Sequence, residues 1–327
     1  TNEVMKKKHI LITGVAGFIG FSLCKELLKD KNKRIIGIDN LNSYYSIKLK
    51  KSRLNVLRKK NNFIFLKIDL IDQKKLKLIF NKYKFDKVYN FAAQAGVRYS
   101  YINPQSYCNS NIIGFNNVLK FVKEYNIPEF YFASSSSVYG DSKPYPKKEK
   151  SKLYPSNIYS LSKLSNEIIS ETFSRSMKTK IIGLRFFSIY GEWGRPDMMI
   201  LKYLLASKFN KSFELFNYGN HYRDFTYIDD AINIVCKIDP KKLRSNFEIF
   251  NICSSKPIKI TKILDIMNNF NIKAKVLQKP LHTADVLKTY GDNKKILDHV
   301  KSFKFTDYKV AVKNTVKWFI FNSKLFN

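Results

Sequence analysis

The fold of this chain is decided by the stretch ILITGVAGFIG, which runs from Ile10 to Gly20. Its apolar beginning predicts a buried strand, and the residues from Phe18 onward predict a helix. Gly14 permits the tight turn between them, Gly17 lets backbone amides approach a pyrophosphate, and Gly20 lets the helix pack closely on its strand. The amino terminus of such a helix attracts phosphate. The stretch therefore predicts the first unit of a dinucleotide-binding domain.

Short apolar runs alternate with amphipathic stretches through the first half of the chain. The apolar runs are typical of strands buried on both faces, and the amphipathic stretches are typical of helices. Their strict succession predicts an α/β fold, a doubly wound parallel sheet of the Rossmann type. The predicted strands are 9–13, 34–39, 63–68, 87–91, 129–133 and 180–186, and the predicted helices are 18–29, 73–82, 106–125 and 158–176.

The rhythm breaks beyond Tyr190, where shorter elements predict a smaller, mixed α/β lobe that binds substrate. We place the dinucleotide-binding domain at residues 5–187 and most of the second lobe at 188–327. Residues from about 225 to 251 are expected to return to the first domain. They contain a predicted helix at 227–238 and a predicted strand at 247–251, and a closing helix is expected at 307–321.

The charge of the chain favours anionic partners. Its 327 residues include 59 Lys and Arg against 26 Asp and Glu, a formal net charge of +33. Such an excess points to nucleic acid, membrane surfaces or acidic small molecules. Only nine of the basic residues are arginine, however, and the lysines are spread without a basic tract. We therefore interpret most of the charge as a solvated surface and expect no nucleic-acid partner.

Several other kinds of protein are disfavoured by what the sequence lacks. No apolar stretch of about 18 residues occurs, so no transmembrane helix or membrane partner is expected. The four cysteines are scattered, which favours free thiols in a reducing, cytoplasmic setting. The four histidines are isolated from one another, and no spacing typical of metal ligands appears, so no metal site is expected.

An acidic residue stands where such a fold places its ribose ligand. Asp39 ends the second predicted strand, 19 residues after Gly20, and can accept hydrogen bonds from an adenosine ribose. A carboxylate here repels a ribose 2′-phosphate, which favours NAD over NADP. The alternative is that Asp39 merely starts a turn. The cofactor residues predicted from these stretches are Gly14, Ala16, Gly17, Phe18, Ile19, Gly20, Asp39, Asn40, Asp69 and Leu70.

A tyrosine and a lysine lie four residues apart in the predicted helix 158–176. Tyr159 and Lys163 therefore share a face. An ammonium near a phenol favours the phenolate, bringing its pKa down from about 10 toward the range of a general base. The serine run 134–137 follows the fifth predicted strand, and one of its hydroxyls can bond the same substrate oxygen. Beside a nicotinamide, this trio predicts a hydride-transfer site.

The glycine loop, Asp39, Tyr159 and Lys163 resemble the extended short-chain dehydrogenase/reductases that act on nucleotide sugars. Further blocks are similar to the UDP-glucuronate 4-epimerase subgroup of that family. They follow one another in order from Ile10 to about Asp292. The blocks are 37–45, 92–100, the serine run through Gly140, 184–191, 193–198 and 218–230.

The resemblance implies NAD-dependent C4 epimerisation of a UDP-sugar, with UDP-glucuronate to UDP-galacturonate as the closest match. It implies that Tyr159 removes the proton of the sugar 4-hydroxyl while NAD takes the C4 hydride. The 4-keto sugar would then turn and receive the hydride on its other face. Ser135 matches the catalytic Ser/Thr position, with Ser136 as the neighbouring candidate, and Lys163 would also hold the nicotinamide ribose. A homodimer that pairs helices 106–125 and 158–176 is implied as well.

The resemblance also assigns residues to the substrate and to the rim of the cofactor site. Arg195 and Arg223 lie in blocks that grip the UDP moiety, where paired phosphates suit a guanidinium fork. Arg98, with Ser137 and Ser188, resembles the set that receives the C6 carboxylate of a uronic acid. The remaining assignments are Phe187 and Asp285 for the substrate and Ala92, Ala93 and Gln94 for the cofactor.

Departures from the subgroup keep alternatives open. They are Ser188, Glu192, Cys253 and Ala284. Glu192 adds a negative charge near the expected uronate, so UDP-glucose or UDP-N-acetylglucosamine 4-epimerisation is the nearest alternative. Dehydratases carry an Asp-Glu pair after the catalytic Thr, and decarboxylases carry Glu in this segment. Ser136 and Ser137 stand there instead, which disfavours both activities. A nucleic-acid-binding protein on a cofactor fold is a further alternative.

Overall fold

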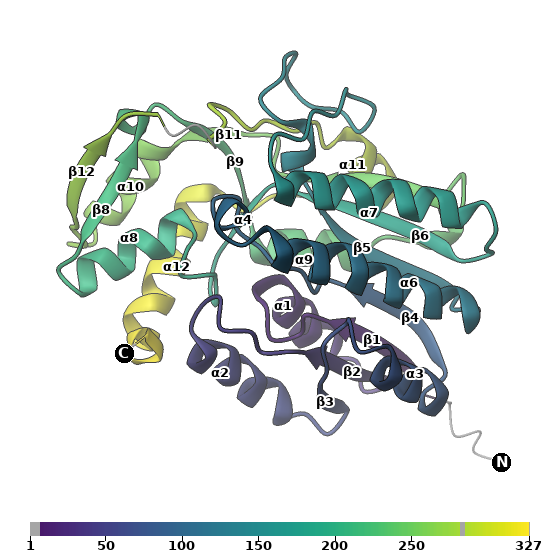
Figure 1. Ribbon diagram of the computed structural model, residues 1–327. Helices are drawn as coiled ribbons and strands as arrows, with labels where there is room; N and C mark the ends of the chain where they lie inside the picture. The colour runs from purple at the N-terminus through teal and green to yellow at the C-terminus, as the bar shows by residue number, and fades with distance from the viewer. Residues whose placement is uncertain (1–6, 282–284, 327) are drawn as a thin grey trace.

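A large parallel sheet forms the centre of the molecule (Figure 1). The computed structural model describes residues 7–281 and 285–326, so His282, Ala284 and the first two residues of the predicted domain lie outside it. Among the described residues, seven strands join in the order β10-β6-β5-β4-β1-β2-β3. This confirms the predicted doubly wound Rossmann-type fold. The strands are β1 (Lys8–Thr13), β2 (Lys33–Asp39), β3 (Phe63–Lys67), β4 (Phe85–Asn90), β5 (Glu129–Ser135), β6 (Lys180–Phe186) and β10 (Phe247–Ile252).

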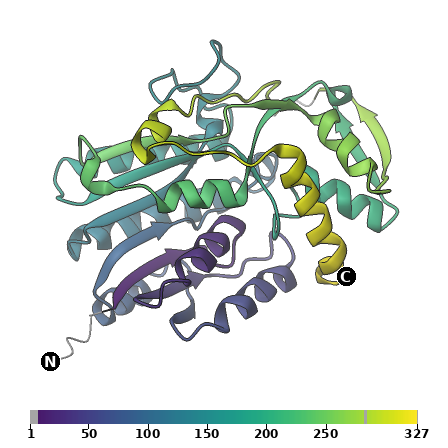
Figure 2. The same cartoon turned by 180° about the vertical axis from the view of Figure 1, so that it is seen from behind.

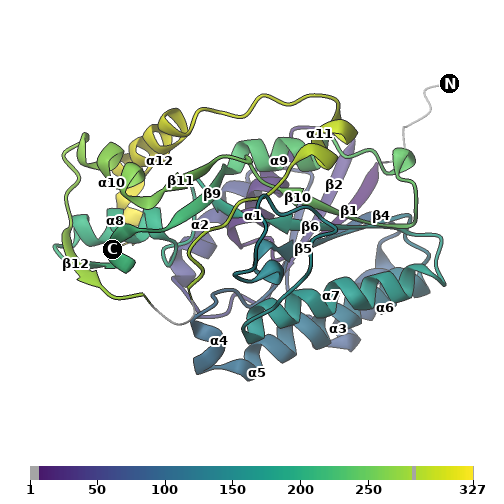
Figure 3. The ribbon, with the colours of Figure 1, turned by 90° about the horizontal axis from the view of Figure 1, so that it is seen from above.

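Helices cover both faces of this sheet, as the view from above shows (Figure 3). Successive residues of β1 point into opposite cores: Ile10 and Ile12 pack with Phe18 and Ala231, whereas Leu11 packs with Val118. The sheet is therefore apolar on both sides. One face carries α1 (Phe18–Leu27), α2 (Ile47–Arg58) and α9 (Ile228–Cys236), and the other carries α3 (Gln73–Lys82), α6 (Gly114–Glu124) and α7 (Ile158–Ser174).

The second lobe contains two smaller sheets. β7 (Ser188–Tyr190) and β11 (Pro257–Lys259) flank β9 (Tyr222–Tyr227), while β8 (Ser212–Phe216) pairs in parallel with β12 (Lys275–Lys279). The view from behind shows the chain crossing from α11 beside the large sheet to α12 beside the second lobe (Figure 2). The helices of this part are α8 (Met199–Lys208), α10 (Ile260–Asn268), α11 (Lys294–Val300) and α12 (Tyr308–Asn322).

Two helical regions differ from the sequence prediction. The helix expected at 106–125 is divided into α5 (Pro104–Tyr107), a π-helical turn η1 (Cys108–Ile113) and α6. A short α4 (Tyr99–Ile102) precedes it. The sequence does not predict α2, because basic residues fill much of its length. Its buried face nevertheless has helical spacing and comprises Leu49, Lys50, Arg53, Leu54 and Leu57.

The four cysteines form no disulfide. Cys24 and Cys253 are buried, Cys108 is half-buried and Cys236 is exposed. Burial raises the pKa of the Cys24 and Cys253 thiols, which keeps both neutral.

Candidate active site

The glycine loop lies at the carboxyl end of β1, where the strand order turns. β2 and β4 flank β1 on opposite sides, and open α/β sheets bind ligands at such a switch point. Gly14 has a φ of +69°, and a Cβ there would come within 2.6 Å of the backbone nitrogen of Ala92. A Cβ on Gly20 would overlap the carbonyl oxygen of Gly14. Both positions require glycine, and the backbone at the start of α1 stays open to a phosphate.

Asp39 is held by backbone donors at the end of β2. Leu41 N donates to its Oδ1 at 2.8 Å, and Ala16 N donates to its Oδ2 at 3.1 Å. Ala16 itself does not line the cleft described below, so its contribution is to orient Asp39. Burial raises the pKa of Asp39, against the effect of these hydrogen bonds and of the Lys50 charge. Lys50 comes from α2, and burial lowers its pKa to about 8.

The predicted cofactor residue Asp69 is also connected to this region. Asn40 Nδ2 donates to Asp69 Oδ2 at 2.8 Å, and Ile71 N donates to Asp69 Oδ1 at 3.1 Å. The carboxylate of Asp69 therefore links the ends of β2 and β3. Asn40, Asp69 and Leu70 all line the same cleft as Asp39.

The first turn of α7 presents Tyr159 to the cleft. Asn157 and Ser160 form a capping box that fixes where the helix begins. Lys163 follows one turn later, and its Nζ lies 5.9 Å from the centre of the Tyr159 ring and donates to Ala133 O at 2.8 Å. Burial lowers the pKa of Lys163 to about 8.

Ser135 is the serine of the run that the structure links to Tyr159. Burial raises the pKa of the Tyr159 hydroxyl, and a hydrogen bond with Ser135 and the positive charge of Arg195 oppose this effect. The sequence assigns that opposing effect to Lys163 instead. Ser135 Oγ accepts from Ser137 N at 3.2 Å and from Ser137 Oγ at 2.9 Å. Because its oxygen accepts both bonds, the proton of the Ser135 hydroxyl stays available for a further acceptor.

A cleft of about 430 Å³ joins the glycine loop to these groups. Every residue predicted for the cofactor, the catalytic trio or the substrate lines it except Ala16 and Arg98. A second cavity of about 440 Å³ adjoins it and shares Ser188, Arg195, Arg223 and Asp285. Arg98 lines this second cavity.

The arginines of the second lobe lie at the far end of the cleft. Arg195 is held by Asp197, with Nε 3.0 Å from Oδ1. Arg223 Nη1 donates to the carbonyl oxygens of Tyr222 at 3.1 Å and Leu287 at 3.3 Å. Burial lowers the pKa of Arg223. Both guanidinium groups are thus oriented by contacts of this chain.

Arg98 lies on the second cavity and is paired with an acid. Its Nη2 donates to both carboxylate oxygens of Asp285, at 3.2 and 3.0 Å, and its guanidinium lies 4.0 Å above the Phe216 ring. It shares the second cavity with Ser188, whereas Ser137 lines only the first. The expected set of Arg98, Ser137 and Ser188 is therefore not assembled around one point.

Glu192 does not add its charge to the cleft. Its carboxylate accepts from the hydroxyl of Tyr227 at 2.8 Å. In the described part of the chain, neither cavity is lined by Glu192. The charge that the sequence places beside the sugar is engaged within the second lobe.

Sequence reasoning missed Asn111, which lies buried on the π-helical turn. Its Oδ1 accepts from Gln94 N at 2.7 Å, and its Nδ2 donates to Gln94 O at 3.0 Å and to Ser162 Oγ at 3.0 Å. Asn111 therefore ties the cofactor rim to the turn of α7 between Tyr159 and Lys163. The sequence does not single it out, because Asn111 is one of four asparagines in the predicted helix 106–125.

Arg53 was also missed, although it is fully buried. Its Nη1 donates to Ala16 O at 2.8 Å and to the Tyr45 hydroxyl at 2.7 Å. Its Nη2 donates to Trp193 O at 2.5 Å and to Gly194 O at 3.0 Å. One side chain of α2 thus joins the glycine loop to the segment that carries Arg195.

The described residues contain neither a membrane-spanning helix nor a cluster of metal ligands. Within 7–281 and 285–326, no helix is long and apolar enough to cross a membrane. In the same residues, no three His, Cys, Asp or Glu side chains gather where they could hold a metal ion.

Known proteins share this arrangement of sequence and fold. The sequence profile described as "NAD dependent epimerase/dehydratase family" matches residues 10–253. The chain belongs to this family. This membership confirms two predictions, namely that the protein is a nucleotide-sugar epimerase and that it has a Rossmann fold.

Three members of the epimerase/dehydratase family show how far the likeness extends. A UDP-glucuronate 4-epimerase of Thermodesulfobacterium geofontis (strain OPF15) is 37% identical over 95% of this chain and 95% of that protein. UDP-glucuronic acid 4-epimerase from Bacillus cereus, solved with UDP-glucuronic acid and NAD, has a TM-score of 0.87 and 28% identity over 96% of this chain and 99% of its own. UDP-glucose 4-epimerase from Thermotoga maritima, solved with UDP-glucose, has a TM-score of 0.86 and 25% identity over the same shares.

Proposed function

We propose that this protein catalyses the NAD-dependent 4-epimerisation of a UDP-sugar, with UDP-glucuronate and UDP-galacturonate as the preferred pair. One observation carries the proposal. A single cleft connects the glycine loop, the Tyr159, Lys163 and Ser135 group, and the two arginines Arg195 and Arg223. That arrangement occurs in a chain 37% identical to a UDP-glucuronate 4-epimerase.

The cofactor end of the cleft fits NAD. The open backbone at Gly14 and Gly17 suits a pyrophosphate at the start of α1. The Asp39 carboxylate suits a ribose with two free hydroxyls and would repel a 2′-phosphate. When bound, NAD supplies an acceptor for the C4 hydride that later returns it, so the reaction has no net redox change.

The chain's own residues handle the proton. Tyr159 takes the proton of the 4-hydroxyl, and Ser135 orients that hydroxyl by a hydrogen bond. Lys163, held by Ala133 O, would hold the nicotinamide ribose of bound NAD. After the 4-keto sugar has turned, Tyr159 gives the proton back to the new hydroxyl. The same group serves as base and as acid, and the site is restored.

The second lobe grips the nucleotide. Arg195 and Arg223 offer guanidinium donors to the two phosphates of UDP. Phe187, Ser188 and Asp285 line the same cleft as these two arginines. We place the boundary between the NAD-binding domain and this lobe between residues 187 and 188.

A second candidate is 4-epimerisation of a neutral UDP-hexose. The observation that favours it is the ion pair between Arg98 and Asp285, because a guanidinium already neutralised by a carboxylate offers less to a uronate. The structure of the Thermotoga maritima enzyme with UDP-glucose is nearly as similar to this fold as that of the uronate enzyme.

We further propose that the protein is a cytoplasmic homodimer that binds no nucleic acid. The dimer is supported by apolar side chains exposed along α4, η1 and α7, which lie together on one side of the molecule (Figure 3). These side chains are Tyr101, Ile102, Ile113, Leu161 and Ile168. Light scattering of the wild-type protein and of Ile168→Asp tests the proposal, and a monomeric wild type would contradict it.

Product analysis tests the reaction. The purified protein is incubated with UDP-glucuronate, UDP-glucose or UDP-N-acetylglucosamine without added NAD, and the products are separated by anion exchange and identified by NMR. We expect UDP-galacturonate from UDP-glucuronate, and NAD in the acid extract of the protein. Conversion of neutral sugars alone would favour the second candidate. Release of carbon dioxide or a 4-keto-6-deoxy sugar would overturn the proposal.

A further inference from the structure

A polar row crosses the apolar sheet behind the cleft. Ser134 of β5, Arg185 of β6 and Asn251 of β10 are register partners on adjacent strands. Their exposed fractions are 3%, 3% and 0%. A buried guanidinium is costly unless it is paired and hydrogen-bonded. The row therefore depends on partners from outside the sheet.

Glu167 of α7 supplies the opposite charge. Arg185 Nε donates to Glu167 Oε1 at 2.8 Å, and Arg185 Nη2 donates to Oε2 at 2.7 Å. Ser134 Oγ donates to the same Oε1 at 2.5 Å. Glu167 follows Lys163 by one helical turn, and Lys163 is bonded to Ala133 O. Two successive turns of α7 are thus fixed to the end of β5, directly beside Ser135.

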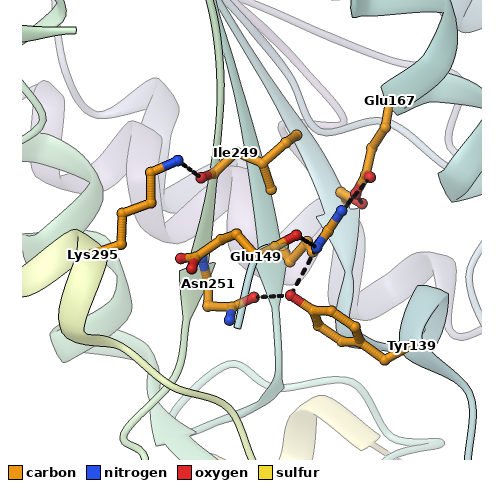
Figure 4. A network of polar contacts seen from close by, with 8 residues as sticks. Tyr139, Glu149, Glu167, Ile249, Asn251 and Lys295 are labelled. Carbon is orange, nitrogen blue, oxygen red and sulfur yellow. Dashed lines mark hydrogen bonds and ion pairs between the residues drawn. The ribbon is translucent and has the colours of Figure 1, made fainter. Parts of the chain in front are cut away.

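The other end of the guanidinium holds the turn that follows β5. Arg185 Nη1 donates to the Tyr139 hydroxyl at 2.8 Å and to Glu149 O at 2.9 Å. The Tyr139 hydroxyl donates to Asn251 Oδ1 at 2.7 Å. Figure 4 shows Glu167, Tyr139 and Glu149 reaching one guanidinium, with Asn251 bonded to the Tyr139 hydroxyl. Tyr139 ends the short helix η2 (Ser136–Tyr139). The Arg185 side chain is therefore bonded to both α7 and η2, the two elements beside the catalytic residues.

We propose that the Glu167–Arg185 pair is a positioning device that sets Tyr159 against Ser135, an inference that rests on the proposed function. Neither Glu167 nor Arg185 is among the described residues that line the cleft. The pair therefore acts through α7 and η2. The pair maintains the hydrogen bond between Ser135 and Tyr159, and this bond opposes the rise in the pKa of Tyr159 that burial causes.

Stability alone does not account for such a pair. Buried ion pairs are often replaced by apolar residues with no loss of stability, because desolvation offsets the attraction between the charges. A bidentate bond between a guanidinium and a carboxylate fixes the relative orientation of the two elements that carry them, because its geometry allows only one placement. Here those elements are the helix that carries Tyr159 and the strand that carries Ser135.

The test compares Glu167→Gln with Glu171→Gln, an exposed residue one turn further along α7. For Glu167→Gln we expect kcat to fall at least about tenfold with KM unchanged, because small misplacements of reacting groups are costly. We also expect the pH at which kcat rises to move upward, because Tyr159 loses its bond to Ser135. Glu167→Ala should lose more than Glu167→Gln. Glu171→Gln should match the wild type.

A milder variant keeps the test decisive if Glu167→Gln does not fold. Ser134→Ala removes the link between Glu167 and β5 without unpairing a charge, and we expect a smaller shift of the pH profile in the same direction. Melting temperature and NAD content are measured for every variant. The proposal is overturned if the folded variants lose only melting temperature and keep the kcat and pH profile of the wild type.

An activity-free measurement separates this proposal from the function on which it rests. Titration of Tyr159 is followed by NMR of ring-labelled protein, with Tyr159→Phe identifying the signal. A higher pKa of Tyr159 in Ser134→Ala supports the positioning role, and an unchanged pKa overturns it. A wild type that converts no UDP-sugar would instead count against the proposed function.

Discussion

The two ends of the cleft are built in different ways. At the hydride end, Ser135 and Lys163 are buried on a strand of the large sheet and on the helix beside it, and Lys163 bonds to main-chain oxygen. At the nucleotide end, Arg98, Arg195 and Asp285 come from segments between longer elements, remain partly exposed, and pair with other charged side chains. The large sheet thus fixes the chemistry. The peripheral segments determine which substrate is held beside the catalytic residues, and they can vary without disturbing the core.

The largest effect should come from Tyr159→Phe. Removing the proton-transferring hydroxyl is expected to lower kcat by about a thousandfold. Binding of UDP-sugar, measured by calorimetry, should stay near the wild-type value, because the nucleotide end is untouched. Tyr154→Phe, on an exposed tyrosine outside the cleft, is the control. Retention of most of the activity in Tyr159→Phe would break the distinction between the two ends.

Arg223→Ala should give the converse pattern. Loss of this half-buried guanidinium, which we propose to bind phosphate, is expected to cost about 2 kcal/mol, roughly a thirtyfold rise in KM, with kcat nearly unchanged. Initial-rate kinetics with Arg244→Ala, an exposed arginine outside the cleft, provides the comparison. A fall in kcat with constant KM would place Arg223 in the chemical step.

Arg98→Ala should have a moderate effect that does not depend on the sugar. Because Arg98 pairs with Asp285 and lies over Phe216, its loss is expected to raise KM about fivefold for UDP-glucuronate and for UDP-glucose alike. Parallel kinetics with both substrates checks this. A loss confined to the uronate would support the carboxylate role that the resemblance assigns to Arg98.

The smallest effect should come from salt. The net charge of +33 attracts any dianionic nucleotide sugar, and added salt screens that attraction. KM is expected to rise by a factor of about two to five from low to high ionic strength, equally for UDP-glucose and UDP-N-acetylglucosamine, which carry the same charge. A steep slope for only one of these two sugars would show that the lysine surface takes part in selection.

The sequence predicts the parts of the site whose chemistry depends on residue type at a fixed spacing. Gly14, Asp39, Tyr159 and Lys163 are of this kind, and the structure brings all four to one cleft. The partner of Arg98 could not be predicted, because Asp285 lies 187 residues further along the chain. Any acidic residue that folding brings near Arg98 could form this ion pair.

The elements that support the site were harder to predict. Asn111 binds main-chain atoms of Gln94, and backbone groups are the same at every position, so no sequence pattern marks them. The helix α2 was missed because its lysines and arginines suggest a solvated face. Two of these charged side chains, Lys50 and Arg53, are in fact buried.

Arg53 limits how this protein can be re-engineered. Its acceptors Trp193 and Gly194 lie 140 and 141 residues beyond it, in the lobe that we propose to bind the sugar nucleotide. A chimaera that takes residues 188 onward from a relative must bring two carbonyl oxygens to the same points, or it leaves a guanidinium buried without acceptors. The glycine loop would be affected as well, because Arg53 also donates to the carbonyl oxygen of Ala16. The two lobes therefore cannot be exchanged as independent modules.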